Sequence, residues 1–367
     1  MAQGFGMSWV GDTPESRVRR LVAAARRVAD PDHPAGRRAR ELLPGATGLS
    51  PEGVEYALTQ CLEIHPTDGD VRTLCTGAPT ARRAHVLLSS NVFVAAHRAI
   101  AIALASSPVV EVRVSRREPT MAALLLEAEP GLFRIVDELA PLPADRVWAY
   151  GRDATLAAIR GDLPGGVVLH AHGDGMGVAV VQTASEERDA LAQMRTLARP
   201  LAFDVVAFDQ RGCLSPRIVL VLGHREAARE LAAAVAKQLV ALEHEIPRGE
   251  MTVEELGEQV WYRDTMVYAC GLLPAGKGTV GYDIERERIV IPPVGRNLHV
   301  VAVEDLGVAL APIAGAVTAA GVAGPTETWE VVRRLLPNAR VSALGKMQKP
   351  RLDGPVDRRP DPAGEVL

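Results

Sequence analysis

Cys213 lies in a polar turn, DQRGCLSP, between two apolar runs, FDVVAFD and RIVLVLG. A structural cysteine is expected inside an apolar run, whereas this one follows Gly212, where the backbone can bend sharply and present a thiol on a loop. Arg211 and Arg217 are expected to lower the pKa of this thiol, and nearby loop amides can stabilise an oxyanion. Cys213 is therefore a candidate nucleophile, with a structural role as the alternative.

Two further polar clusters end predicted strands. Asn91 follows the run AHVLLSS, and an amide at the carboxyl end of a parallel strand lies where α/β proteins bind ligands. The alternative for Asn91 is a cap of the strand end. The run VEVRVSRREP ends in side chains suited to a ribose or a phosphate, or else forms a solvated turn; they are Arg113, Ser115, Arg116 and Arg117.

Three other motifs carry less weight. GDGMGV (173–178) has its third glycine one residue too early for a dinucleotide fingerprint and predicts a turn between strands. GLLPAGKG has Gly278 where a phosphate loop needs a hydroxyl, and a strand follows it, so we reject a phosphate site. His170 and His172 share one face of a strand but lack a third ligand, and the chain has no CxxC pair, so no metal site is expected.

The elements that must position these residues alternate from residue 85 onward. Strand-like runs separated by ten to fifteen helical residues are the pattern of βαβ units on a parallel sheet, which predicts an α/β fold with a Rossmann-type domain. Four segments are predicted: a helical segment at 1–80, a nucleotide-binding domain at 81–200, a catalytic domain at 201–335 and a C-terminal segment at 336–367. This last segment is expected to return to the first domain, with a loosely ordered tail from Gly354.

Three local predictions complete the second domain. FDVVAFD is expected to be a strand, and residues 288–291 another. Residues 306–326 carry no charge over about the length of a membrane span, but they consist mainly of Ala, Gly and Val and include Pro312. We therefore expect a buried helix there.

Composition narrows the function classes. The 367 residues are 47% apolar and 23% charged with a net charge of −4, which predicts a globular protein and argues against nucleic acid as the main partner. Aromatic residues make up only 4%, too few to stack along a single strand. The four cysteines form no disulfide pattern and the first residues contain no apolar signal segment, so we expect reduced thiols and a cytoplasmic protein.

Five segments, in order, resemble the acyl-CoA reductases of the LuxC type, a branch of the aldehyde dehydrogenase superfamily. They cover most of residues 81–360, and the match to the nucleophile segment is the most specific. The segments are LLSSNVFVAAHRAI, VEVRVSRREP, YGRDATLAAIRGDLPGGVVLHAHG, FDVVAFDQRGCLSPR and LGKMQKPRLDGPVD.

The resemblance implies an aldehyde dehydrogenase-like fold and roles for single residues. Cys213 matches the catalytic thiol and Asn91 the amide that binds the oxyanion. Arg113 stands where the family usually has a ribose-binding Lys, with Ser115 and Arg116 beside it. Gly151 matches the loop near the cofactor pyrophosphate.

The implied activity is the reduction of a fatty acyl thioester, acyl-CoA, to the aldehyde through an acyl-cysteine intermediate. The arginines near the ribose site favour NADPH over NADH as the cofactor, because a guanidinium attracts the 2′-phosphate. A homo-oligomer and an acyl-transferring partner protein are further expectations. The sequence leaves open a carrier-protein thioester or an acyl phosphate as substrate.

Several departures from the family pattern also leave open a scaffold without catalysis. Phe93 replaces the usual Pro, Arg113 replaces Lys, and the C-terminal GPVDRR lacks the usual Trp and His.

Overall fold

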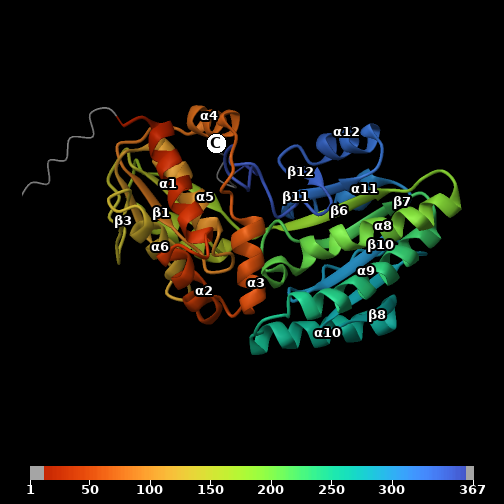
Figure 1. The fold of residues 1–367 in the computed structure, drawn as a ribbon. Helices are drawn as coiled ribbons and strands as arrows, with labels where there is room; N and C mark the ends of the chain where they lie inside the picture. Colours follow the sequence, from red (N-terminus) through yellow and green to blue (C-terminus); the bar gives the residue numbers. More distant parts are fainter. Residues whose placement is uncertain (1–11, 361–367) are drawn as a thin grey trace, which may run out of the picture. The chain divides into compact units, whose positions relative to one another are not determined.

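The computed structural model describes residues 12–360, which divide into two compact units (Figure 1). Among the described residues, the first unit contains 12–39, 63–173 and 351–355, and the second contains 40–62, 174–350 and 356–360. The expectation that no signal segment is present rests in part on residues 1–11, which lie outside the described residues.

The division differs from the predicted boundaries. It falls after Gly173 instead of residue 200, because strand β6 (Met176–Gln182) pairs with β7 (Pro216–Leu222) and β11 (Val317–Ala323) in the sheet of the second unit. Most of the predicted C-terminal segment also belongs to the second unit, and only 351–355 return to the first.

Residues 354–360 are the described part of the tail that was expected to be loosely ordered, and 361–367 lie outside the described residues. Arg98 donates to the carbonyl oxygens of Arg351, at 2.7 Å, and of Gly354. Further along, Asp357 is buried and is joined to Arg359.

The first unit has a five-stranded parallel sheet in the order β3-β2-β1-β4-β5. Its strands are β1 (Ala84–Leu87), β2 (Val110–Arg113), β3 (Arg134–Ile135), β4 (Arg146–Tyr150) and β5 (Val168–His172). This is the strand order of a Rossmann domain, in which ligands bind at the carboxyl ends where the order reverses, here between β1 and β4. The predicted α/β alternation is confirmed.

Helices cover both faces of this sheet. Helix α1 (Pro14–Ala29) begins at the N-cap Thr13 and buries an apolar face that includes Val18 and Leu21. Helix α1 contacts α5 (Ala95–Ser106) and α6 (Thr120–Ala128), and α5 packs on β1 and β2. On β4 and β5, Leu156 of α7 (Asp153–Asp162) packs against Val147 and Leu169.

The remaining helices of the first 80 residues were also predicted as helical. They are α2 (Pro34–Thr47), within which the division after Ala39 falls, α3 (Pro51–Tyr56), the π-helical turn η1 (Ala57–Cys61) and α4 (Asp68–Gly77). Ser50 caps α3, because its side chain accepts from the N–H of Gly53, and Cys61 is buried.

The second unit has a seven-stranded sheet in the order β12-β11-β6-β7-β10-β9-β8. All neighbouring strands are parallel except β8 and β9, which form a hairpin. The strands not yet given are β8 (Gly271–Ala275), β9 (Gly278–Asp283), β10 (Asn297–Val303) and β12 (Arg340–Ala343). The segment GLLPAGKG forms β8, the hairpin turn and the first residue of β9, so the predicted strand after it is confirmed.

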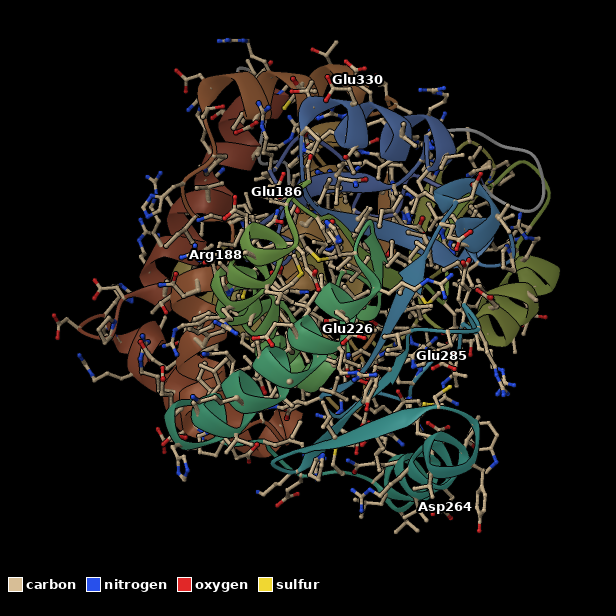
Figure 2. All side chains as sticks on the ribbon, turned by 90° about the vertical axis from the view of Figure 1, so that its right-hand side faces the viewer. Glu186, Arg188, Glu226, Asp264, Glu285 and Glu330 are labelled. Atoms are coloured by element: carbon tan, nitrogen blue, oxygen red, sulfur yellow. The ribbon has the colours of Figure 1, made fainter. Side chains whose placement is uncertain are left out.

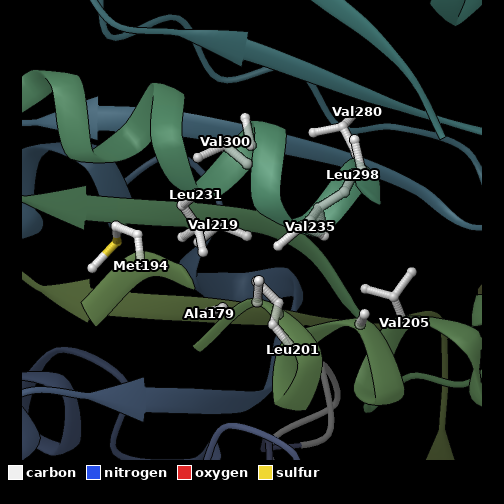
Figure 3. Close-up of a cluster of buried hydrophobic side chains, with 14 of the residues drawn as sticks. Ala179, Met194, Leu201, Val205, Val219, Leu231, Val235, Val280, Leu298 and Val300 are labelled. Atoms are coloured by element: carbon white, nitrogen blue, oxygen red, sulfur yellow. The ribbon is translucent and has the colours of Figure 1, made fainter. Parts of the chain in front are cut away.

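Apolar side chains fill both faces of the central strands. Helices α8 (Glu187–Val206) and α9 (Arg225–Glu245) cover one face, where Leu201 and Leu231 lie against Val219 (Figure 3). Helices α11 (Leu306–Leu310) and α12 (Thr326–Leu335) cover the other.

Several charged residues on the helices of the second unit are exposed. Helix α10 (Val253–Ala269) packs along β8 and β9. Glu226 on α9, Asp264 on α10 and Glu330 on α12 are exposed and point away from the sheet (Figure 2).

Two of the predicted strands are wrong. FDVVAFD forms the last turn of α8 and the 3₁₀ turn η2 (Ala207–Gln210), because a short apolar run buries equally well in a helix and in a strand. Residues 288–291 have no regular structure.

The predicted buried helix at 306–326 is also wrong. The segment contains the short helix α11, the 3₁₀ turn η3 (Ala314–Ala316) and strand β11, which is apolar except for Thr318 and is buried on both faces. Within 12–360, no helix is long and apolar enough to span a membrane.

Candidate active site

The turn that carries Cys213 is set up by three consecutive residues with left-handed backbone. Phe208, Asp209 and Gln210 have φ values of 54°, 50° and 67°. Residues other than glycine rarely adopt this region, and such strain persists only where the surroundings hold it in place. The chain therefore reverses sharply between α8 and Cys213 before it enters β7.

An ion pair holds the middle of this reversal. The carboxylate of Asp209 accepts hydrogen bonds from Nε and Nη2 of Arg296, at 2.9 and 2.8 Å, and from the backbone N–H of Gly249 at 3.0 Å. Asp209 and Arg296 are both fully buried. Removing either partner would leave a buried charge, so the pair fixes this conformation.

The side chain of Gln210 closes the turn. Its Nε2 donates to the carbonyl oxygens of Pro216 at 2.8 Å and Asn297 at 2.6 Å, and its Oε1 accepts from the N–H of Asn297 at 2.8 Å. Gln210 thus ties the start of the turn to its end and to the first residue of β10. The sequence motif DQRGC therefore contains two positioning residues, Asp209 and Gln210, ahead of the thiol.

Cys213 itself is half-buried and packs closely on β11. The hydroxyl of Thr318 donates to the backbone oxygen of Cys213 and also hydrogen-bonds the thiol. A Cβ at Gly177 would lie 2.5 Å from the backbone oxygen of Leu214, and one at Gly175 would lie 2.5 Å from Thr318 Cγ2. Gly175, in the connection between β5 and β6, and Gly177, in β6, thus give the Cys213 turn room to approach.

The C-terminal segment brings two charges to the thiol. Arg359 donates from Nε and Nη2 to the carboxylate of Asp357, at 2.9 and 2.8 Å, and to the backbone oxygens of Gly315 and Asp174. The charges of Asp357 and Arg359 both reach the thiol of Cys213. Sequence reasoning did not identify Thr318, Asp357 or Arg359, which lie more than 100 positions after Cys213.

The pKa of the Cys213 thiol is raised to about 11, mainly by burial and then by the charge of Asp357. The hydrogen bond from Thr318 and the charge of Arg359 act in the opposite direction. The expectation that Arg211 and Arg217 lower this pKa is wrong. Arg211 is turned to Glu255, which accepts from its Nε and Nη2 at 2.8 and 3.0 Å.

A buried carboxylate anchors the C-terminal GKMQ segment beside this turn. Asp204 on α8 accepts hydrogen bonds from the backbone N–H groups of Gly345 and Met347, the latter at 3.0 Å. Gln348 donates to Asp204 O and Ser215 Oγ, both at 3.3 Å. Burial raises the pKa of Asp204 to about 7 despite these bonds.

The other predicted site residues lie in the first unit, at the carboxyl ends of three neighbouring strands. Asn91 follows β1, Arg113 ends β2 and Gly151 follows β4, so the residues flank the point where the strand order reverses. Asn91 is exposed, and a Cβ at Gly151 would meet no atom within 4 Å. These groups are accessible to a ligand at the edge where a Rossmann sheet binds one.

The basic cluster after β2 fits an anionic ligand. Arg113, Arg116 and Arg117 are exposed, and no ion pair joins them to a carboxylate within the described part of the chain. Ser115 Oγ accepts from the N–H of Arg117 at 3.2 Å. The nearby Glu118 is buried and accepts from the first amides of α6, so its carboxylate is directed into that helix.

His170 and His172 do not form part of a metal cluster. Their rings stack on Trp148 and Tyr150 of β4, with centroid distances of 4.9 and 4.7 Å. Among residues 12–360, no group of three or more His, Cys, Asp or Glu side chains is arranged to hold a metal ion.

Comparison with solved structures shows the fold. An NAD-dependent benzaldehyde dehydrogenase from Corynebacterium glutamicum is similar, with a TM-score of 0.66 and 14% identity over 93% of this chain and 84% of that chain. So is a Mycobacterium tuberculosis aldehyde dehydrogenase complexed with NAD+, with a TM-score of 0.63 and 15% identity over 93% of this chain and 79% of that one. A methylmalonate-semialdehyde dehydrogenase from Oceanimonas doudoroffii gives a TM-score of 0.66 and 15% identity over 94% and 80%. The chain has the aldehyde dehydrogenase fold.

Comparison at the level of sequence gives the family. No curated protein matches the chain. The family described as acyl-CoA reductase (LuxC) matches residues 134–348, which is more than half of the chain and includes the Cys213 turn. Together with the fold, this match supports an oxidoreductase, and the chain belongs to the acyl-CoA reductase (LuxC) family.

Proposed function

We propose that this protein reduces a fatty acyl thioester, acyl-CoA, to the aldehyde with NADPH, through an acyl-cysteine on Cys213. The observation that carries the proposal is the turn around Cys213. Two buried side chains, Asp209 and Gln210, hold three left-handed residues so that the half-buried thiol stands on a rigid loop. Strain of this kind, held by buried polar groups, is typical of functional sites.

In the first step, the sulfur of Cys213 attacks the thioester carbonyl and the CoA thiolate leaves. The raised pKa means that the thiol is protonated in the free enzyme, so its proton must leave as the carbon–sulfur bond forms. The departing CoA thiolate takes up one proton, which balances the step. Asn91 is proposed to donate its amide N–H to the oxyanion, a contact worth about 3 kcal/mol in comparable sites.

The first unit is proposed to hold the cofactor, and the second to carry the chemistry. Gly151 leaves room for the pyrophosphate, and Arg113, Ser115 and Arg116 would face the ribose and its 2′-phosphate. When bound, the reduced nicotinamide supplies the hydride that releases the aldehyde and restores the Cys213 thiol. A cytoplasmic location and a homo-oligomer belong to the same proposal, as does an acyl-transferring partner protein.

The test is acylation of the protein by acyl-CoA without cofactor. The peptide that contains Cys213 should gain one acyl mass, and NADPH added afterwards should release the aldehyde. Cys213→Ala should remain folded, gain no acyl group and lose reduction. An acyl group mapped to Cys61, Cys75 or Cys270 would overturn the assignment.

A second candidate is a scaffold that has kept the fold and lost catalysis. The observation that favours it is the thiol pKa of about 11, because a reactive cysteine usually has a lowered one. The same acylation experiment decides: the scaffold gains no acyl mass on Cys213 at any pH. Parallel assays with acyl-CoA, an acyl carrier protein and an acyl phosphate separate the substrates that the sequence left open.

A further inference from the structure

Arg217 lies on β7, four residues after Cys213. Its guanidinium is largely shielded from solvent but makes few hydrogen bonds with the protein. Its Nη1 makes one long hydrogen bond, 3.4 Å, to the backbone oxygen of Pro292. Its Nε is shielded from solvent and has no acceptor among the described residues. A guanidinium has five N–H donors, and buried charges are normally paired, so among the described residues this side chain lacks an acidic partner and its Nε lacks an acceptor.

The other arginines around the Cys213 turn differ in this respect. Arg211 binds Glu255, Arg296 binds Asp209, and Arg359 binds Asp357, each through two nitrogen atoms. Arg217 makes no ion pair within the described residues, and the lowered pKa of its guanidinium reflects burial without a contacting carboxylate. Glu258 and Asp174 are the acidic groups whose charge reaches it, and neither contacts it.

The position of Arg217 relates it to the reacting thiol. Gln210, which closes the Cys213 turn, binds the carbonyl oxygen of Pro216, the residue just before Arg217. The backbone of Arg217 is therefore fixed relative to Cys213, and its side chain is partly buried and partly open to solvent. Because Arg217 follows Cys213 by four positions, we expect an anion on the thiol half of the substrate to lie within its reach when the thioester meets Cys213.

On the basis of the proposed function, we infer that Arg217 binds a phosphate group of the thiol donor from which the acyl group is transferred. A phosphate accepts two parallel hydrogen bonds from a guanidinium, which supplies the partner that Arg217 lacks. CoA and a carrier-protein phosphopantetheine arm both carry such a phosphate. Pantetheine, which has the same thiol arm, carries none.

The test measures binding by calorimetry, without any turnover. Wild-type protein should bind CoA more tightly than pantetheine, and Arg217→Gln should lose about 10- to 100-fold in CoA affinity, the effect of hydrogen bonds to a charged group. Arg217→Lys keeps the charge without the planar fork and should lie between the two. Arg225→Gln, at an exposed ion pair with Glu304, is the matched control and should bind CoA as wild type does.

A third ligand, 4′-phosphopantetheine, identifies which phosphate is bound. If it binds wild type as CoA does, and Arg217→Gln weakens both, the phosphate of the pantetheine arm is the ligand. A loss confined to CoA assigns one of the nucleotide phosphates. The inference is overturned if wild type binds CoA and pantetheine equally, or if Arg217→Gln, shown to be folded by its thermal unfolding, keeps the wild-type ratio.

The outcome is separable from that of the proposed function. Reduction of acyl-CoA with an unaffected CoA affinity in Arg217→Gln would refute the inference and leave the function intact. CoA binding that depends on Arg217, without acylation of Cys213, would support the inference and refute the proposed function.

Discussion

The side chain of Gln210 and the backbone of Asn297 hydrogen-bond each other in both directions, at 2.6 and 2.8 Å. The amide of Gln210 thus acts as a peptide group would in a neighbouring strand. The side chain takes the place of a backbone hydrogen-bonding partner for the first residue of β10. Gln210, which is fully buried, therefore holds the Cys213 turn together with the Asp209–Arg296 pair.

Gln210→Ala should lower both stability and the rate of acylation. The variant leaves the N–H of Asn297 and two backbone oxygens without their partner, which costs about 1–3 kcal/mol for each buried group left unpaired. Urea unfolding measures the first effect, and acyl transfer to Cys213 at a temperature where the variant is folded measures the second. Gln60→Ala, at an exposed position, is the control. Wild-type acylation in folded Gln210→Ala would show that the turn does not need this side chain.

A second prediction concerns the pH dependence of the thiol. Alkylation by iodoacetamide requires the thiolate, so its rate at Cys213 should rise with pH up to about 11. Asp357→Asn removes a negative charge near the thiol and should shift this profile to lower pH, so that alkylation at pH 8 becomes faster. Arg359→Gln should shift it to higher pH. Profiles that coincide in all three proteins would show that the pair does not set the reactivity of Cys213.

The sequence predicts that Cys213 lies in a turn, but not the residues that surround it. The polar turn between apolar runs identifies the cysteine, and the alternation of elements predicts a Rossmann sheet. The partners of Asp209 and Gln210 lie 87 positions further along the chain, so no local pattern indicates them. The thiol pKa is missed for the same reason, because Asp357 is distant in sequence and burial cannot be read from a turn.

The errors in secondary structure also have a physical cause. FDVVAFD and residues 306–326 are apolar at nearly every position, so neither a period of 2 nor one of 3.6 stands out. Strand pairing and helix packing decide which of these segments is a strand and which is a helix. Strand β11 must lie between β6 and β12, whereas Leu201 and Val205, one helical turn apart, must both face the strands beneath α8.

Asn91 should affect the transition state and not the fold. Its side chain is exposed, so truncation to Ala leaves no buried group without a partner and should change stability by less than about 0.5 kcal/mol. Turnover should fall on the order of 100-fold, with little change in cofactor affinity. Asn91→Asp, which has a similar shape but lacks the N–H donors, should lose at least as much. An equal loss of cofactor binding would instead make Asn91 a structural or cofactor-binding residue.

The last prediction is the choice of cofactor. In the proposed site, the ribose lies at the end of β2, where Arg113 and Arg116 are exposed without a contacting carboxylate. The next acid after these arginines, Glu118, is buried, and its Oε1 accepts hydrogen bonds of 2.8 Å from the N–H groups of Thr120 and Met121, so it is directed into α6. The local charge therefore favours a 2′-phosphate, by about 2 kcal/mol or 30-fold for one charge-assisted contact.

Arg116→Glu should reverse the preference, because a carboxylate repels the 2′-phosphate and accepts from the 2′-hydroxyl of NADH. Dissociation constants for both cofactors, from the quenching of protein fluorescence, give the ratio without any need for turnover. Arg72→Glu, a charge reversal at an exposed position on α4, controls for the change in net charge. If wild type binds NADH and NADPH equally, the arginines do not contact the phosphate. If Arg72→Glu also reverses the preference, the net charge of the protein sets the choice of cofactor, and the arginines after β2 do not.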